Sequence, residues 1–244
     1  MLGLPDGIRA CLFDMDGVLT ETATVHARAW KSMFDDYLRQ GDGDDFKPFT
    51  QDDYDEYVDG KPRYDGVKSF LSSRGIELPQ GSSSDAPATE TIDGLGNRKN
   101  ELVLKIIHDE GVKPYPGSVR YVNAVREAGL HTACVSSSVN AGEVLEAAGI
   151  RDRFEKLVDG HVVEDQGLRG KPAPDTYLKA AEELGVSPAE AAVFEDALSG
   201  VQAGRAGNFG FVVGVDRVGQ AEALAAHGAD VVVQDLAELL EDDA

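Results

Sequence analysis

The chain has 244 residues, of which 42% are hydrophobic, enough for one large domain or for a core domain with a smaller second one. Its 23 basic and 44 acidic residues give a formal charge of -21. This charge argues against nucleic acid or an anionic membrane as a partner, because either would need a basic surface. We see no signal peptide and no segment near the roughly 20 apolar residues that span a bilayer. We therefore expect a monomeric cytoplasmic protein, with Cys11 and Cys134 as buried reduced thiols.

Short apolar runs, each bounded by polar or turn residues, predict buried strands. They are residues 8–13, 131–135, 155–158, 191–194, 209–215 and 229–233. Their hydrophobicity is continuous rather than alternating, which is typical of parallel strands that are covered on both faces. Between them lie helical patterns that end at Gly or Asn, at 118–130, 140–150, 173–186 and 200–208. This alternation predicts an α/β core with a doubly wound, mainly parallel sheet.

The segment from 21 to 113 has a different character. It contains charged and aromatic helical patterns at 26–40, 65–76 and 98–111, but no convincing strand. A run rich in Ser, Pro and Gly at 79–90 predicts a surface loop. We expect residues 21–113 to form a helical cap domain that is inserted after the first strand, and residues 1–20 and 114–244 to form the core domain.

Polar residues follow successive predicted strands. Asp14 and Asp16 follow the first strand, "SSSVN" (136–140) follows the second, and Glu195 and Asp196 follow the fourth. The segment "RGKPAPD" after the third strand contributes Lys171. In an open α/β sheet, ligands bind outside the carboxyl ends of the strands, so we expect these side chains to meet at one edge.

The chemistry of this set is that of phosphoryl transfer. Carboxylates from two strand ends form an oxygen-only site that suits Mg²⁺. A Lys and small polar side chains before a helix suit the oxygens of a phosphoryl group, and the candidates are Ser136, Ser137, Asn140 and Lys171. Asp14 can then attack phosphorus, and Asp16 can exchange protons with the oxygen that leaves or arrives. Each motif alone is weak, since most Asp-x-Asp pairs are solvated turns, and only their joint appearance in this order carries the hypothesis.

With these motifs the chain resembles the haloacid dehalogenase (HAD) superfamily. The resemblance rests on "DMDGV", on Ser136 in "VSSS", on Lys171 in "GKPAPD" and on "EDALSG". It implies a Rossmann-like core, a nucleophilic Asp14 and Asp16 as general acid and base. It also implies Mg²⁺ bound by Asp14, the backbone carbonyl of Asp16 and Asp196, with Glu195 assisting, under a mobile cap that excludes water.

Within that superfamily, "DGVLTETATVHARAW" is similar to the β-phosphoglucomutase-like subfamily. The similarity implies that Thr22, His26 and Trp30 belong to the hinge and cap. It further implies that Arg63 anchors a distal phosphate, and that Lys99 and Asn100 supply the remaining cap contacts. The substrate would be a small phosphorylated sugar, with β-glucose 1-phosphate converted to glucose 6-phosphate through a glucose 1,6-bisphosphate intermediate.

Alternatives remain open at this point. A phosphatase could hydrolyse a small sugar phosphate with the same residues, and a non-catalytic phosphosugar sensor is a third hypothesis. Arg63, His26 and Lys99 favour the mutase, because they would retain a phosphorylated acceptor that a phosphatase does not need. Trp30 suits core packing at least as well as substrate contact, and His26 and Lys99 could equally be surface residues of a helix.

Overall fold

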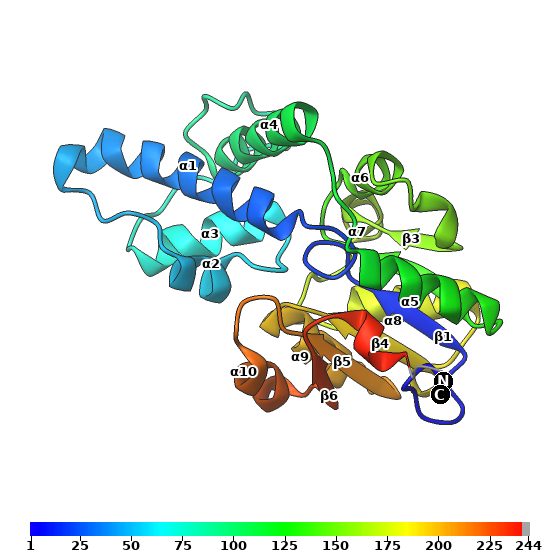
Figure 1. Cartoon of the computed structure of the whole chain (residues 1–244). Coiled ribbons are helices and arrows are strands. Elements are labelled where there is room, and N and C mark those ends of the chain that lie inside the picture. Colours follow the sequence, from blue (N-terminus) through cyan, green and yellow to red (C-terminus); the bar gives the residue numbers. More distant parts are fainter. Residues whose placement is uncertain (241–244) are drawn as a thin grey trace. The chain divides into compact units, whose positions relative to one another are not determined.

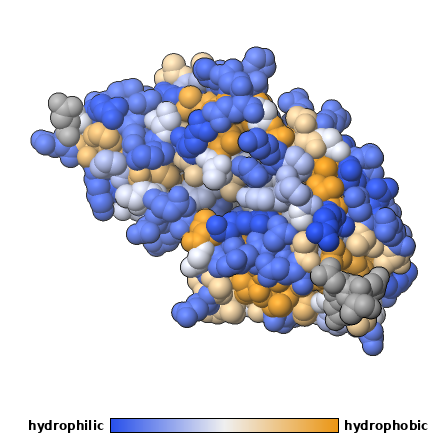
Figure 2. Space-filling view, viewed as in Figure 1, coloured by the Kyte–Doolittle hydropathy of each residue, from blue (hydrophilic) through white to orange (hydrophobic). Residues whose placement is uncertain are grey.

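The computed structural model describes residues 1–240, except the side chains of Asp42 and Asp44, and the chain divides into two compact units (Figure 1). Residues 1–21 and those from 112 onward form an α/β unit, and Thr22–Gly111 forms a helical unit. Within the described residues, no helix has the length and apolar character needed to cross a bilayer. Hydrophilic side chains cover most of the face shown in Figure 2, as the acidic composition leads one to expect.

The α/β unit is built on a six-stranded sheet in which every neighbouring pair is parallel. Its strands are β1 (Ala10–Phe13), β2 (His131–Val135), β3 (Lys156–Val158), β4 (Ala191–Glu195), β5 (Phe211–Val215) and β6 (Val231–Val233). Their order is β3-β2-β1-β4-β5-β6, so the direction of winding reverses between β1 and β4. This confirms the predicted doubly wound sheet, and the reversal is the switch point at which such sheets bind ligands.

Helices cover both faces of this sheet. They are α5 (Pro116–Glu127), α6 (Ala141–Ala147), α7 (Gly160–Gln166), α8 (Asp175–Leu184), α9 (Leu198–Ala206) and α10 (Ala221–His227). Short 3-10 helices lie at Arg151–Arg153, Pro188–Glu190 and Leu236–Leu239. The sequence patterns did not predict α7 or α10. Each has seven residues, fewer than two full turns, so its apolar period is weak. Helix α6 has the same length, but its pattern continues to Ile150 and was predicted.

Alternation along the strands assigns α5 and α8 to opposite faces of the sheet, because successive side chains point to opposite sides. Phe13 of β1 stacks on Phe194 of β4 with ring centroids 4.5 Å apart, and it meets Tyr121 of α5 edge-on at 6.3 Å. The preceding residue, Leu12, belongs instead to the hydrophobic cluster that contains Tyr177 of α8. The hydrophobic core of the α/β unit therefore has two layers, one on each face of the sheet, and both include residues at the end of β1.

Both cysteines are buried in this sheet as free thiols, which confirms the sequence interpretation. Cys11 lies on β1 and Cys134 on β2. Burial raises the pKa of each thiol well above its ordinary value, because the apolar surroundings disfavour the thiolate. They are packing residues of the core.

The helical unit contains α1 (Ala23–Asp42), α2 (Gln51–Tyr57), α3 (Arg63–Ser73) and α4 (Ile92–Glu110), with a 3-10 helix at Gly43–Asp45. Its core is aromatic. Phe34 lies 5.2 Å from Trp30, 5.1 Å from Phe49 and 4.2 Å from Phe70 between ring centroids. These contacts join α1 to α3 and to the segment before α2, and the burial of such large rings is the main stabilisation of the unit.

Helix α2 falls in the acidic run "TQDDYDEY", outside the helical patterns that the sequence predicted for residues 21–113. Its start is fixed by a reciprocal pair of hydrogen bonds. The hydroxyl of Thr50 accepts from the backbone N–H of Asp53, and the carboxylate of Asp53 accepts from the backbone N–H of Thr50. This capping box satisfies N–H groups that the first turn of a helix leaves open.

The predicted surface loop at 79–90 is ordered against the start of α4. The side-chain amide of Asn97 donates to the backbone carbonyls of Ser83 and Asp85, at 3.0 and 2.9 Å. Gly94 allows the loop to approach, because a Cβ at this position would collide with the carbonyl oxygen of Thr89. Glycine lowers the intrinsic stability of a helix, but here it is needed for a close contact between the loop and α4.

The two segments at which the chain leaves and re-enters the α/β unit lie side by side. The N–H of Glu21 donates to the carbonyl of Lys113, and the N–H of Tyr115 donates to the carbonyl of Leu19, both at 2.9 Å. A long insertion can therefore follow β1 without separating the strands on either side of it.

Candidate active site

The carboxyl ends of β1, β2 and β4 lie at one edge of the sheet, and the predicted catalytic and phosphate-binding residues that follow these strands lie there. The N–H of Asp14 donates to the carbonyl of Phe194 at 2.9 Å, which carries the β1–β4 ladder one residue beyond Phe13. In the same way, the N–H of Ser136 donates to the carbonyl of Val158 and continues the β2–β3 ladder. Because side chains alternate across the sheet, Asp14 continues the face that is covered by α8.

Asp14, Glu195 and Asp196 bring three carboxylates together at the switch point. One oxygen from each lies within 4.8 Å of the others, and both Asp14 and Glu195 are buried. Lys171, also buried, is the ammonium group in direct contact with this set. Three carboxylates facing one ammonium leave an excess of negative charge in an oxygen-only site. This donor set fits Mg²⁺, which prefers carboxylate and water ligands.

Lys171 is fixed between two of these carboxylates. Its Nζ donates to Oδ1 of Asp14 at 2.5 Å and to Oε1 of Glu195. The same oxygen of Glu195 accepts from the hydroxyl of Tyr177 at 2.9 Å, and Oε2 accepts from the N–H of Ala197 at 3.0 Å. Both oxygens of Glu195 are therefore engaged by protein donors, and its clearest structural task is to orient Lys171.

The surroundings of Asp14 and Lys171 raise the pKa of both groups, which favours the charged form of Lys171 but the neutral form of Asp14. Burial alone would lower the pKa of Lys171, but the charges of Asp14 and Glu195 outweigh it and raise that pKa well above its usual value. Burial raises the pKa of Asp14, Lys171 opposes this, and the carboxylates of Glu195 and Asp16 add to it. A divalent cation at this edge would favour the ionised form of Asp14, which a nucleophile needs.

Gly17 shapes the turn that carries Asp16. Its φ of +84° lies in the left-handed region, where a residue with a side chain is strained. A Cβ here would also collide with the carboxylate of Asp196, so the turn after β1 packs directly against the loop after β4. Gly200 likewise makes room for Glu195. The glycine of "DMDGV" is thus required by the close approach of the two loops, and the last glycine of "EDALSG" by the side chain of Glu195.

The hydroxyl cluster after β2 forms a self-supporting loop. The N–H of Ser138 donates to Oγ of Ser136 at 3.1 Å, and the N–H of Asn140 donates to Oγ of Ser138 at 3.2 Å. Ser136 is buried, whereas Ser137 and Asn140 are half-buried. Because β2 neighbours β1, this loop lies at the same edge as Asp14.

In the helical unit, the structure brings four predicted residues together. Nζ of Lys99 lies 2.9 Å from Nδ1 of His26 and 4.8 Å from the ring centroid of Trp30. The carbonyl of Thr22 accepts from the N–H of His26 at 2.9 Å. Asn100 follows Lys99 on α4. Trp30 is only 3% exposed and belongs to the aromatic core, so the packing interpretation of this residue is the one that the contacts favour.

Arg63 is the first residue of α3, and its guanidinium is held by its neighbours in the helical unit. Nη2 donates to the hydroxyl of Tyr64 at 3.1 Å, and that hydroxyl donates to Oδ1 of Asn97 at 3.0 Å. Nε of Arg63 is buried and has no hydrogen-bond partner among the described residues. Gly96 leaves room for the ring of Tyr64, which a Cβ would touch.

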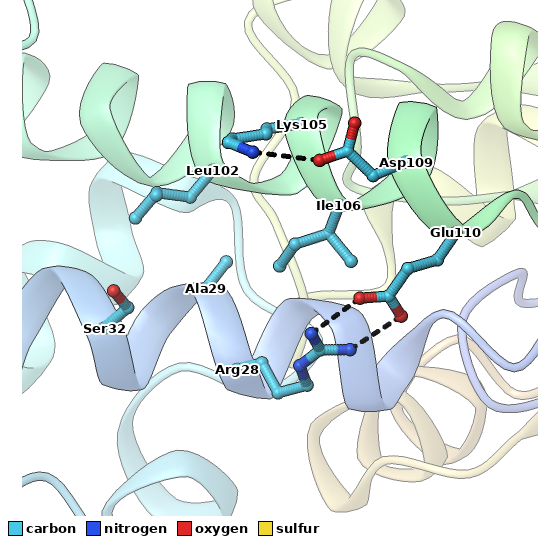
Figure 3. Close-up of a pocket in the computed structure, with 8 residues that line it drawn as sticks. All are labelled: Arg28, Ala29, Ser32, Leu102, Lys105, Ile106, Asp109 and Glu110. Carbon is cyan, nitrogen blue, oxygen red and sulfur yellow. Dashed lines mark hydrogen bonds and ion pairs between the residues drawn. The ribbon is translucent and has the colours of Figure 1, made fainter.

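A surface groove of about 340 Å³ lies between α1 and α4 (Figure 3). Its apolar lining comes from Ala29, Leu102 and Ile106, while Arg28 of α1 pairs with Glu110 of α4 through two hydrogen bonds of 2.7 and 2.9 Å. The remaining lining residues are Ser32, Lys105 and Asp109. None of the eight is a predicted site residue, so this groove is separate from the sequence-derived site.

Sequence reasoning missed several residues that contact the site. Tyr177 donates a hydrogen bond to Glu195. Two residues that follow β5 contact the turn after β1 and the loop after β4. Arg217 donates to the carbonyl of Gly17, and Gln220 donates to the carbonyl of Asp196. The rule that polar residues after strand ends meet at one edge would have found the latter two, had it been applied to the fifth strand.

The chain is similar to known proteins along nearly its whole length. A sequence model described as haloacid dehalogenase-like hydrolase matches residues 8–208. β-Phosphoglucomutase from Mycobacterium bovis is 58% identical, over 98% of this chain and 94% of that protein. The crystal structure of β-phosphoglucomutase from Clostridium difficile has a TM-score of 0.76 at 26% identity, covering 96% of this chain and 93% of that one.

A further solved structure, of CbbY from Rhodobacter sphaeroides in complex with phosphate, has a TM-score of 0.71 at 26% identity. It covers 95% of this chain and 96% of that one. The family match extends from before β1 to the end of α9 and therefore includes all four motifs. The chain belongs to the haloacid dehalogenase-like hydrolase family, as an enzyme of its β-phosphoglucomutase-like branch.

Proposed function

We propose that the protein is a Mg²⁺-dependent sugar phosphomutase that converts β-glucose 1-phosphate to glucose 6-phosphate through a phosphorylated Asp14. The observation that carries the proposal is the assembly of Asp14, Lys171 and Asp196 at the switch point of the sheet. The 58% identity to a mycobacterial β-phosphoglucomutase, along nearly the whole of both chains, supports the mutase over other phosphotransferases.

Asp14 and Asp16 perform the bond changes. In the first half-reaction, Asp16 takes the proton from the 6-hydroxyl of β-glucose 1-phosphate as that oxygen attacks the phosphoryl group on Asp14. The bond from phosphorus to the Asp14 oxygen breaks, and glucose 1,6-bisphosphate forms. After the bisphosphate turns over, the Asp14 carboxylate attacks the phosphorus at C1, and Asp16 returns the proton to the departing sugar oxygen. Glucose 6-phosphate leaves, and Asp14 is phosphorylated again.

Asp14, the backbone carbonyl of Asp16 and Asp196 would hold the Mg²⁺, with Glu195 assisting. When bound, the ion offsets negative charge between the carboxylates and the phosphoryl oxygens. The excess of carboxylates over ammonium groups supports this assignment. Because Glu195 already accepts hydrogen bonds from Lys171 and Tyr177, its assistance is indirect: it keeps Lys171 beside Asp14.

The remaining residues at the edge bind the phosphoryl group that is being transferred. Lys171 supplies a charged donor, and its two carboxylate partners keep it protonated. Ser136, Ser137 and Asn140 supply small polar groups from the loop after β2, which its internal hydrogen bonds keep in one conformation. A loop fixed in advance costs less ordering when the phosphoryl group binds.

The helical unit acts as the cap in this proposal. Arg63 anchors the phosphate that is not being transferred, while Thr22, His26, Lys99 and Asn100 contact the sugar phosphate or the hinge. The buried Nε of Arg63, which lacks a protein partner among the described residues, supports a ligand-binding role for this side chain. Trp30 supports the cap from within its core. A monomeric state and a cytoplasmic location stay predictions.

Hydrolysis of a small sugar phosphate is the second candidate, favoured by the description of the matched family as hydrolases. The same Asp14, Asp16 and Lys171 would act, and water instead of a sugar hydroxyl would attack the phosphorylated Asp14. The two functions therefore differ only in the acceptor, and thus in what the cap retains.

Phosphorus NMR of a single reaction distinguishes them. Purified protein is mixed with Mg²⁺, β-glucose 1-phosphate and a trace of glucose 1,6-bisphosphate. The mutase predicts glucose 6-phosphate with little inorganic phosphate, and turnover that depends on the bisphosphate. Stoichiometric release of inorganic phosphate would reject the mutase in favour of the phosphatase. The Asp14→Asn variant is the control, and it should be inactive in either case.

A further inference from the structure

The loop that follows β5, Asp216–Gln220, makes contacts with both acidic loops of the site. Nε of Arg217 donates to the carbonyl of Gly17 at 2.9 Å, in the turn that carries Asp16. The side-chain amide of Gln220 donates to the carbonyl of Asp196 at 3.0 Å. The two acceptors belong to residues that already touch, since Gly17 has no room for a side chain beside Asp196. The loop thus holds both sides of one close contact.

Arg217 is itself held from several directions. Nη1 donates to the carbonyl of Gln234 at 2.6 Å and lies 3.4 Å from the carboxylate of Asp235. The guanidinium stacks on Tyr115, 3.7 Å from the ring centroid. Only 16% of its side chain is exposed. An arginine that is stacked and paired in this way has lost most of its freedom before it meets Gly17, so the contact is a rigid one.

The backbone of the loop is fixed by a single carboxylate. Oδ1 of Asp216 accepts from the N–H groups of Val218, Gly219 and Gln220, at 3.2, 2.7 and 2.8 Å. The N–H of Asp216 in turn donates to the carbonyl of Val233 at 2.7 Å, which ties the loop to the end of β6. Such side-chain to backbone bonds stabilise a turn that would otherwise be mobile.

We propose that the 216–220 loop is a positioning element for the metal-binding groups of Asp16 and Asp196, in which Arg217 and Gln220 hold the Asp16–Gly17 turn and the Asp196 loop together. This inference rests on the proposed Mg²⁺-dependent function. Like charges on the two acidic loops repel each other whenever no cation lies between them. Neutral and cationic donors on their backbone carbonyls oppose that repulsion without competing for the carboxylate oxygens. Arg217 and Gln220 are therefore positioning residues.

Metal binding by variants tests the proposal without relying on turnover. Arg217→Met keeps the aliphatic stem and removes the guanidinium, and Gln220→Met keeps the length and removes the amide. Affinity is measured with Mn²⁺, which accepts the same oxygen ligands as Mg²⁺, through the spin-resonance signal of the free ion. Mutation of residues that hold metal ligands in place without binding the metal typically lowers metal affinity by about 10–100-fold. We therefore expect each variant to weaken Mn²⁺ binding by about 10-fold.

Arg205 provides the matched control. It donates to the carbonyl of Gly228 at 3.1 and 2.6 Å and pairs with Asp230, just before β6, at the opposite end of the strands from the site. Arg205→Met removes a comparable arginine-to-carbonyl contact from the same unit. It should lower the thermal midpoint but leave Mn²⁺ affinity within twofold of the unmodified protein.

The outcomes separate this inference from the function on which it rests. Unchanged Mn²⁺ affinity in both Arg217→Met and Gln220→Met, with Asp196→Asn strongly weakened, would overturn the positioning role and leave the metal site intact. Equal weakening by Arg205→Met would also overturn it, since the effect would then be general destabilisation. No Mn²⁺ binding by the unmodified protein would reject the metal site and the inference with it. If Arg217→Met does not fold, Arg217→Lys and Gln220→Met carry the test.

Discussion

Nζ of Lys171 lies 2.5 Å from Oδ1 of Asp14, and both groups are buried. The same ammonium contacts Glu195, so one positive charge compensates two carboxylates. We predict that Lys171→Met abolishes phosphoryl transfer and lowers the free energy of unfolding by about 3–5 kcal/mol, because it leaves two buried carboxylates uncompensated. Urea unfolding and an assay with a phosphate ester measure the two effects.

The double variant Lys171→Met, Glu195→Gln separates stability from catalysis. Removing the second carboxylate relieves most of the repulsion around Asp14, so we expect it to recover at least half of the lost stability. Activity should stay at the level of the single variant, because the charged donor is still missing. Recovery of activity in the double variant would show that Lys171 only balances charge.

The helical unit gives a test of the distinction between mutase and phosphatase. If Arg63 anchors the distal phosphate, Arg63→Ala should reduce mutase turnover by at least 100-fold. Hydrolysis of a small phosphate ester, which has no second phosphate, should change less than threefold. Steady-state assays of the two reactions in parallel measure the ratio. An equal loss in both would mean that Arg63 serves the packing of α3 and Tyr64 instead.

Asp53 makes the stability of the helical unit depend on pH. Burial alone would raise the pKa of Asp53, but hydrogen bonds from Thr50 and the contact with Arg74 at 2.7 Å outweigh it and leave the pKa below its usual value. A carboxyl group whose pKa is lower when folded stabilises the fold above its unfolded pKa of about 3.9. This contribution is lost as pH falls from there through the folded pKa.

We therefore expect Asp53→Asn to cost about 1 kcal/mol at pH 7, and the difference from the unmodified protein to shrink below about pH 4. The fluorescence of Trp30, the only tryptophan of the chain, reports the unfolding of this unit in urea at each pH. A difference that is the same at pH 7 and pH 3 would show that the charge of Asp53 contributes nothing.

Gly94 tests the close approach of the 79–90 loop to α4. Alanine is usually favoured over glycine in a helix by up to about 1 kcal/mol, but a Cβ at residue 94 would collide with the carbonyl of Thr89. We predict that Gly94→Ala destabilises the helical unit by about 1–3 kcal/mol, the usual range for overpacking. Trp30 fluorescence in urea again provides the measurement.

Gly41, near the end of α1, is the matched control for Gly94. No atom outside its own neighbourhood lies within 4 Å of a Cβ built there, and its φ is not positive. Gly41→Ala should therefore leave stability unchanged or raise it by up to about 1 kcal/mol. A similar gain in both variants would show that the loop moves aside at little cost.

The sequence predicted the sheet well because its signal is local. Each strand contains a short, mostly apolar run, and a residue directly after such a run, like Asp14 after β1 or Glu195 at the end of β4, must lie at the carboxyl edge. Helix α2 was not predicted because its residues are mostly polar and show no apolar period. Its signal was the capping pair of Thr50 and Asp53, a feature of two residues rather than a period.

The missed parts of the site depend on contacts between distant segments. Tyr177 gives no sign in the sequence that its hydroxyl reaches Glu195, since it lies inside an ordinary amphipathic helix. Arg217 and Gly17 are 200 positions apart in the sequence. Their loops come together only because β1, β4 and β5 are adjacent in the sheet. Such contacts follow from the strand order, which composition and periodicity do not contain.

The most direct test of the proposed mechanism is whether Asp14 becomes phosphorylated during turnover. The protein is mixed with Mg²⁺ and glucose 1,6-bisphosphate, quenched in acid within milliseconds and digested, and the peptide that contains Asp14 is analysed by mass spectrometry. We predict a transient gain of one phosphoryl group on Asp14, which is absent in Asp14→Asn. Rapid turnover with no phosphorylated Asp14 at any quench time, or with the group on another residue, would contradict it.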